Sequence, residues 1–436
     1  CILVLSVMIA LATPFGNYIK TAVENTTEGL FETSNKGLST VGASADNSNF
    51  AFTDGTVKHH YYSSIALAVS DAGEHTTANA DCDKDTASAE IAVREKDDKY
   101  IVKALKNQTI TESIEMKGEQ IFDTNSKEIE LKAGVELKPV SNSVITFRDE
   151  GGKGKIYKDV DTSSAEALIT TKSVNNCSVT ILNGTYNISN NNGRGIAVWN
   201  NGNNKINIQN GNYYAHSSSY AVAVIDQLSD SKSIVINGGN FTAQTEDKTA
   251  TAIYDVETIK NANVKAIGTN DSKSNSAKIR GITLYMASTG IIENTNVVAD
   301  YHLYNNSSKE DYECEGITIN TNLRTNKDGT FFINNCNVKG TREGLSLMGQ
   351  NAVIYINGGV YQGVRHGGAY FGVKKTVVQN ATFKKWDYDG QFEKDKLHSW
   401  NANFYVGATL ASPKVYMNNC KVDKNYKSVI SSNYEY

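Results

Sequence analysis

The sequence predicts a mainly β protein built as a solenoid of stacked coils, preceded by a long N-terminal helix that is first apolar and then amphipathic. Three observations predict this arrangement. A six-residue motif recurs nine times between residues 181 and 422, the chain holds 48 asparagines and only three prolines, and residues 1–19 carry no charged side chain. Asn is unfavourable in helix interiors but tolerates turns and left-handed backbone, so a chain this rich in Asn is not mainly helical.

Composition excludes several classes of protein. The 436 residues carry 43 basic and 47 acidic side chains, a net charge of −4, which gives no basic footprint for nucleic acid. Aromatic and β-branched residues occur along the whole chain, unlike a disordered sequence. The six cysteines show no zinc-ligand spacing and are too sparse for a disulfide scaffold.

The first element is the N-terminal segment. Residues 1–19 are long enough to cross a membrane as a helix, and apolar residues continue near helical spacing to Val41. We therefore expect a helix over residues 1–45 that assembles or anchors the protein. The side chains expected to become buried there are Ile2, Leu3, Val4, Leu5, Val7, Met8, Ile9, Leu11, Phe15 and Ile19.

This segment resembles the N-terminal helix of type IV pilin-like filament subunits in its length, polarity and position. Leu5 stands where that family usually has a glutamate. The resemblance implies that the apolar half lies in the membrane before assembly and in the core of a filament afterwards.

The second element is the repeat. Each copy has an aliphatic residue, a variable residue, Asn or Gly, a small residue, a variable residue, and then an aromatic residue or Val. The shortest interval between copies is 22 or 23 residues, which we interpret as a bare coil, and longer intervals contain loop insertions. Further strands with alternating apolar residues, such as 195–199 and 281–285, lie between the copies, so each coil has two or three short strands. The copies are 181–186, 208–213, 236–241, 259–264, 292–297, 333–338, 356–361, 378–383 and 417–422.

The motif itself explains how a coil turns a corner. Its Asn can adopt left-handed backbone and can stack its amide on the Asn of the next coil, while the small residue points into a narrow interior. This pattern resembles the right-handed parallel β-helix of the pectate-lyase-like superfamily over about residues 100–436. The resemblance implies the fold and says little about activity.

The third element is a cap, expected within residues 46–99 together with a linker. Residues 61–69 are similar to the short helix that precedes the first strand, here 99–105, in many bacterial surface β-helix proteins. An uncapped solenoid would expose its apolar interior and strand edges. Residues 74–90 are polar and are expected to form a surface loop.

Catalytic residues are not expected. The Asp- and His-containing signatures of polygalacturonase-like hydrolases do not occur in the repeat, where Arg365-His366-Gly-Gly368 is the nearest approach. Glycoside hydrolysis uses two facing carboxylates, and we expect no two coils to bring a pair into the same register.

Two insertions contain candidate binding residues. Glu310, Asp311, Glu313 and Glu315 could bind calcium, although an acidic stretch of this kind can equally be a solvated loop, and no other cofactor is expected. Trp386, Tyr388 and Trp400 would suit stacking on a sugar ring, or could cover the solenoid or contact a neighbouring subunit.

Two cysteines occupy the same small position of the motif. Cys336 and Cys420 are three coils apart, too far for a disulfide, so we expect buried thiols.

The function expected from these features is structural. The chain would be a subunit of a bacterial extracellular filament, with apolar helices in the core and the β-helix displayed at the cell surface. Its partners would be copies of itself, the membrane before assembly, and glycans. Two alternatives stay open: a monomeric, surface-tethered adhesin that binds glycans, and a polysaccharide lyase or hydrolase.

Overall fold

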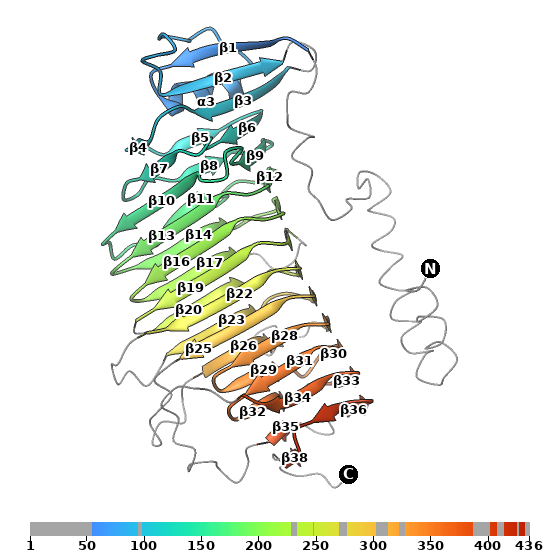
Figure 1. The fold of residues 1–436 in the computed structure, drawn as a ribbon. Helices are drawn as coiled ribbons and strands as arrows, with labels where there is room; N and C mark the ends of the chain where they lie inside the picture. Colours follow the sequence, from blue (N-terminus) through green and yellow to red (C-terminus); the bar gives the residue numbers. More distant parts are fainter. Residues whose placement is uncertain are drawn as a thin grey trace. The chain divides into compact units, whose positions relative to one another are not determined.

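Three long sheets dominate the fold (Figure 1). The computed structural model describes residues 55–94, 98–227, 233–246, 248–269, 277–301, 313–321, 328–386, 402–407, 414–424 and 427–431. The chain divides into two units, residues 1–51 and residues 52–436. The helix expected over residues 1–45, with its assembly side chains from Ile2 to Ile19, lies outside the described residues. Within the described part, no helix has the length and apolar character needed to cross a membrane.

Every coil contributes one strand to each sheet, and successive strands of a sheet are parallel, with two exceptions in the cap. Sheet A comprises β1 (Val57–Tyr62), β2 (Ala89–Arg94), β3 (Lys99–Ala104), β6 (Glu119–Asp123), β9 (Val144–Arg148), β12 (Ser178–Ile181), β15 (Lys205–Ile208), β18 (Ile234–Asn237), β21 (Thr258–Lys260), β24 (Thr289–Glu293), β27 (Gly329–Asn334), β30 (Ala352–Asn357), β33 (Lys375–Gln379) and β36 (Lys414–Asn418). Sheet B comprises β4 (Gln108–Ile110), β7 (Glu128–Leu131), β10 (Lys155–Val160), β13 (Thr185–Asn190), β16 (Asn212–Ser217), β19 (Asn240–Thr245), β22 (Asn263–Gly268), β25 (Asn296–Tyr301), β28 (Asn337–Gly340), β31 (Val360–Gly363), β34 (Thr382–Lys385) and β37 (Lys421–Val422). Sheet C comprises β5 (Ile114–Met116), β8 (Leu137–Pro139), β11 (Glu166–Thr170), β14 (Arg194–Asn200), β17 (Tyr220–Asp226), β20 (Thr249–Tyr254), β23 (Lys278–Leu284), β26 (Glu313–Asn320), β29 (Glu343–Met348), β32 (His366–Phe371), β35 (Ala402–Gly407) and β38 (Lys427–Ser431).

The described strands thus form a β-helix, as the repeat predicts. Its coils are numbered here from the cap, so that β3, β4 and β5 form coil 1 and β36, β37 and β38 form coil 12. Neighbouring strands of a sheet are about 4.8 Å apart, which sets the rise per coil.

The predicted motif forms the corner between sheets A and B. Its Asn has positive φ at Asn261, Asn294, Asn335 and Asn380, with φ between 49° and 54°, which confirms the expected left-handed backbone. The small residue after it points inward, and Cys336 is fully buried in that position.

The main amide ladder lies two residues later than expected, at the fifth motif residue instead of the third. Each Asn Nδ2 donates to the Asn Oδ1 of the preceding coil, at 2.8 to 3.1 Å. The third-position ladder that the sequence suggests is present between Asn419 and Asn380, at 2.7 Å. The fifth-position ladder runs through Asn212, Asn240, Asn263, Asn296 and Asn337.

Aromatic side chains at the sixth motif position stack inside the solenoid. The Tyr186 and Tyr213 rings are stacked and nearly parallel, with centroids 5.1 Å apart, and Phe241 continues the stack 4.8 Å further on. Burial would leave the phenol groups unsatisfied, so each tyrosine donates its hydroxyl to its own corner: Tyr213 Oη lies 2.9 Å from the carbonyl oxygen of Asn210.

The cap consists of α3 (Ile65–Gly73) and the strands β1 and β2, which pair antiparallel with each other; β2 also pairs antiparallel with β3. Ser64 caps the helix by accepting a hydrogen bond from Leu67 N. A short helix is therefore present in this region, but it spans Ile65–Gly73 rather than residues 61–69, and residues 61 and 62 belong to β1. Strand β2 corrects the expected loop, because residues 89 and 90, assigned to that loop, belong to a strand.

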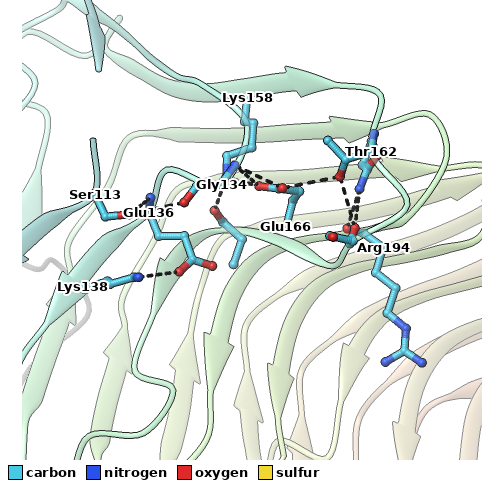
Figure 2. A network of polar contacts seen from close by, with 11 residues as sticks. Ser113, Gly134, Glu136, Lys138, Lys158, Thr162, Glu166 and Arg194 are labelled. Carbon is cyan, nitrogen blue, oxygen red and sulfur yellow. Dashed lines mark hydrogen bonds and ion pairs between the residues drawn. The ribbon is translucent and has the colours of Figure 1, made fainter. Parts of the chain in front are cut away.

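One buried ion pair crosses from sheet B to sheet C in coil 3 (Figure 2). Lys158 Nζ lies 2.7 Å from Glu166 Oε2 and also donates to the carbonyl oxygen of Ala167 at 2.9 Å. The Glu166 carboxylate accepts further hydrogen bonds from Gly134 N at 3.0 and 3.1 Å. Burial lowers the pKa of Lys158, and its bond to Glu166 opposes that shift.

Candidate functional site on the outer faces of sheets A and C

The outer faces of the three sheets are exposed to different degrees. In sheets A and B, inward residues are buried and outward residues are mostly half-buried or exposed, as β13 and β27 illustrate. Strands β14, β17, β23 and β26 of sheet C are buried at nearly every position. A ligand can therefore approach the outer side chains of sheet A, whereas those of sheet C are covered.

Sheet A carries an apolar column on its outer face, which we call the sheet A ridge. Its members are direct register partners on coils 8 to 12. The rings of Phe332 and Tyr355 stack with centroids 5.2 Å apart and planes 11° apart. Tyr416 is 43% exposed at the end of the column, and Lys375 Nζ lies 5.8 Å from its ring centroid. The sheet A ridge comprises Ile291, Phe332, Tyr355, Val377 and Tyr416, of which Val377 is buried and the others are half-buried or exposed.

A column of side-chain amides runs beside the sheet A ridge, again with one residue per coil. It comprises Asn334, Asn357, Gln379 and Asn418, all half-buried or exposed. Asn357 Oδ1 accepts a hydrogen bond from Asn380 at 3.3 Å. Among the described residues, the side-chain amides of Asn334, Gln379 and Asn418 make no hydrogen bond, so they are available to a ligand that offers hydroxyl groups.

The outer face of sheet C carries charged residues over coils 7 to 10. Arg280 forms ion pairs with Glu313 and with Glu315, the latter at 3.4 Å from Nε to Oε2. Thr318 donates to Glu315 Oε2 at 2.5 Å. These groups are held mainly by one another, so they resemble a structural network more than an open binding site.

Two glutamates of this face correct the expectation that no two coils bring carboxylates into register. Glu315 and Glu343 are direct partners on β26 and β29, and His366 follows on β32. Although burial alone would raise the pKa of Glu343, the charges of Arg342, His366 and Arg365 and the His366 hydrogen bond lower it to about 2. Glu343 is therefore held as a carboxylate and is unsuited to act as a general acid.

A sequence signal for this column exists. A glycine directly follows each of Arg280, Glu315, Glu343 and His366. These four residues are register partners on successive strands of sheet C. The glycines are required because the chain passes close to its neighbours there: a Cβ on Gly316 would lie 2.3 Å from Val338 Cγ1 and 2.7 Å from the carbonyl oxygen of Gly344. Aligning the strands on the glycine would have shown the charged column.

The calcium candidates are only partly described. Glu310 and Asp311 lie outside the described residues. Glu313 is paired with Lys278 at 3.3 Å and with Arg280, which already supply the positive charge that a calcium ion would bring. No cluster of three or more potential metal ligands is found in the ranges that the structure describes.

Of the three glycan candidates, the structure describes Trp386. It is half-buried at the end of β34, where its backbone N–H donates to the carbonyl oxygen of Gly363 at 3.0 Å, and Lys339 Nζ lies 5.7 Å from its ring centroid. Tyr388 and Trp400 lie outside the described residues. The sequence motif does not reveal the sheet A ridge. Each member of the ridge stands one residue before the first, aliphatic residue of the motif, and a single apolar residue there looks like part of an ordinary strand.

The two motif cysteines are free thiols, as expected, but only Cys336 is buried, whereas Cys420 is half-buried. Cys336 Sγ lies 3.3 Å from the carbonyl oxygen of Asn334, and burial raises the pKa of its thiol to about 11. Cys336 therefore remains protonated and packs as a small apolar side chain.

Comparison with protein-family models, with curated proteins and with solved structures finds no match to this chain.

Proposed function

We propose that this protein is a surface-displayed, right-handed β-helix that binds a glycan through the sheet A ridge. One observation carries the proposal: two stacked, half-buried rings lie on the outer face beside a column of amides, three of which make no hydrogen bond within the described part of the chain. The C–H groups of a sugar can pack against the outward edges of these rings, and its hydroxyl groups can pair with the amides. Handedness follows from the strong preference of parallel crossovers for the right-handed form.

The arrangement favours binding over hydrolysis. The carboxylate pair on sheet C is buried, and Glu343 is held ionised by its cationic neighbours. A hydrolase needs one carboxyl group that stays protonated long enough to donate a proton. The candidate Trp386 follows β34 of sheet B and is therefore not a member of the sheet A ridge.

A glycan array tests the proposal. The parent chain and the double variant Phe332→Ala Tyr355→Ala would be compared, with Tyr214→Ala as the matched control because Tyr214 is a half-buried outward tyrosine of sheet B. We expect the parent and the control to bind the same glycans and the double variant to lose them. Failure of the parent to bind any glycan, or equal binding by the double variant, would refute the proposal.

A filament role is a separate proposal that rests on the charge-free sequence of residues 1–19. Apolar segments of this length bury together in a polymer core or in a membrane. A chain lacking residues 1–20 should be folded, soluble and monomeric by light scattering. Filaments that persist in electron micrographs of this variant would contradict the assembly proposal and leave glycan binding untouched.

A further inference from the structure

We infer that the ligand of the sheet A ridge is an extended, uncharged β-1,4-linked polysaccharide that lies parallel to the solenoid axis, with one sugar on each coil. This inference rests on the proposed function and adds the class, direction and length of the ligand.

The direction of the polysaccharide follows from the register of the strands in sheet A. Phe332, Tyr355, Val377 and Tyr416 are direct partners on successive strands, so the sheet A ridge runs across the strands and along the axis. Its period is one coil, about 4.8 Å, and the observed ring spacing is 5.2 Å. This is close to the length of one sugar in a fully extended chain. A polysaccharide lying along a strand would instead meet one ring and then leave the ridge.

The arrangement of the rings favours a flat polysaccharide. Because the planes of Phe332 and Tyr355 differ by 11°, both rings present the same edge to the outside. A flat ribbon, which β-1,4 linkage produces, can touch every member of such a row, whereas a coiled chain would lift away after one or two sugars. The amide column repeats with the same period on coils 9 to 12, so a sugar on coil 9, 10 or 12 meets one ring and one amide, whereas on coil 11 the apolar member Val377 is buried.

The neutral side chains at the centre of the sheet A ridge indicate an uncharged polysaccharide. On β27 and β30 the outward residues are neutral: Thr330, Phe332 and Asn334 on the first strand, and Val353, Tyr355 and Asn357 on the second. The neighbouring Glu293 of coil 8 is paired with Lys260 at 3.0 Å. Lys375 and Lys414 flank the distal end only. An anionic sugar would gain no partner over coils 9 and 10 and would lose part of its hydration there.

Calorimetric titration with oligosaccharides of defined length tests the inference. The probes are β-1,4-linked glucose oligomers of two to eight sugars, with oligogalacturonates of the same lengths as the charged comparison. Affinity for the neutral series should rise with each added sugar up to about five, the number of coils in the ridge, and then level off. The galacturonates should bind at least about tenfold more weakly at every length.

Two variants locate the ligand. Phe332→Ala, at the stacked pair, should weaken binding of the trimer and the hexamer alike, by about tenfold. Tyr416→Ala, at the far end, should weaken the hexamer by a similar factor and leave the trimer unchanged, and Tyr214→Ala should change neither. Circular dichroism of each variant establishes that the solenoid is intact.

The outcomes separate the two claims. Affinity that levels off at two sugars, a Tyr416→Ala effect equal for trimer and hexamer, or a preference for galacturonates would overturn the inference while glycan binding stands. If the array shows a glycan ligand but the glucose series does not bind, the assigned linkage class is wrong. An array without any ligand refutes the proposed function itself.

Discussion

The Lys158–Glu166 ion pair allows a quantitative test of how the solenoid interior is stabilised. Lys158 and Glu166 have side-chain exposures of 0% and 5%, and their charged atoms are 2.7 Å apart. Removing one partner of such a pair leaves a buried charge uncompensated, which costs about 3–5 kcal/mol. Lys158→Met and Glu166→Gln should therefore each lower the free energy of unfolding by about that amount.

The double variant Lys158→Met Glu166→Gln should recover most of this loss. Ile188 is the register partner of Lys158 on the next coil, so an apolar side chain fits that column. Gln can still accept the hydrogen bond of Gly134 N. Replacing a buried pair by groups of similar volume is often neutral or stabilising, so the double variant should lie within about 1 kcal/mol of the parent.

Urea denaturation followed by circular dichroism measures these differences, and hydrogen exchange of β10 and β11 detects local opening in a repeat protein. The exposed pair Lys132–Glu130, with side-chain exposures of 52% and 25%, supplies the matched control. Lys132→Met should cost no more than about 1 kcal/mol. The reasoning is refuted if Lys158→Met costs as little as Lys132→Met, or if the two single losses simply add in the double variant.

Three further predictions follow from other interior positions. Burial raises the pKa of Asp255 to about 7, against the opposing hydrogen bonds from Met286 N and Tyr285 N. The folded state therefore holds a proton that the unfolded state releases, so stability should fall by up to about 4 kcal/mol as pH rises from 4 to 7, and Asp255→Asn should flatten that profile in denaturation experiments. Gly316→Ala should destabilise by about 1–3 kcal/mol, because its Cβ would meet Val338 and the backbone of Gly344, and a thermal melt equal to that of the parent would contradict this. Tyr213→Phe should cost about 1 kcal/mol by urea denaturation, the value of its hydroxyl bond to Asn210, since Phe241 shows that the ring alone fits the stack.

The fold could be predicted because its corners are local. A left-handed residue followed by a small inward residue and an aromatic residue is dictated by backbone sterics and by the narrow interior, and those constraints act within six residues. Asn335, Cys336 and Val338 illustrate this, since each does what the motif requires. Strand β2 was not predictable in the same way. It pairs antiparallel with strands on both sides in the cap, where no repeat marks its register.

The candidate site was harder to predict because it depends on register between coils rather than on any one coil. Phe332 and Tyr355 are 23 positions apart in the chain and become neighbours only through sheet A pairing. Glu315 and Glu343 likewise meet only when strands are aligned on the glycine that follows each. Intervals between motif copies range from 22 to 41 residues, so alignment on the motif alone does not carry the register through the insertions to sheet C.

The same geometry explains why interior and exterior can carry separate roles. In sheet A, side chains alternate, so Phe331 and Ile333 fill the core while Phe332 between them faces outward. Outward residues contribute little to packing, which leaves them free to vary without loss of the fold.

The corner between sheets A and B is only two or three residues long in coils 4 to 12, and the long connections, such as those from Tyr301 to Glu313 and from Lys385 to Ala402, join sheet B to sheet C. The outward column of apolar residues on coils 8 to 12, with amides beside it on coils 9 to 12, is therefore not a by-product of core packing, because the core constrains only the residues between them. Its persistence across successive coils is the feature that selection for an extended ligand would produce.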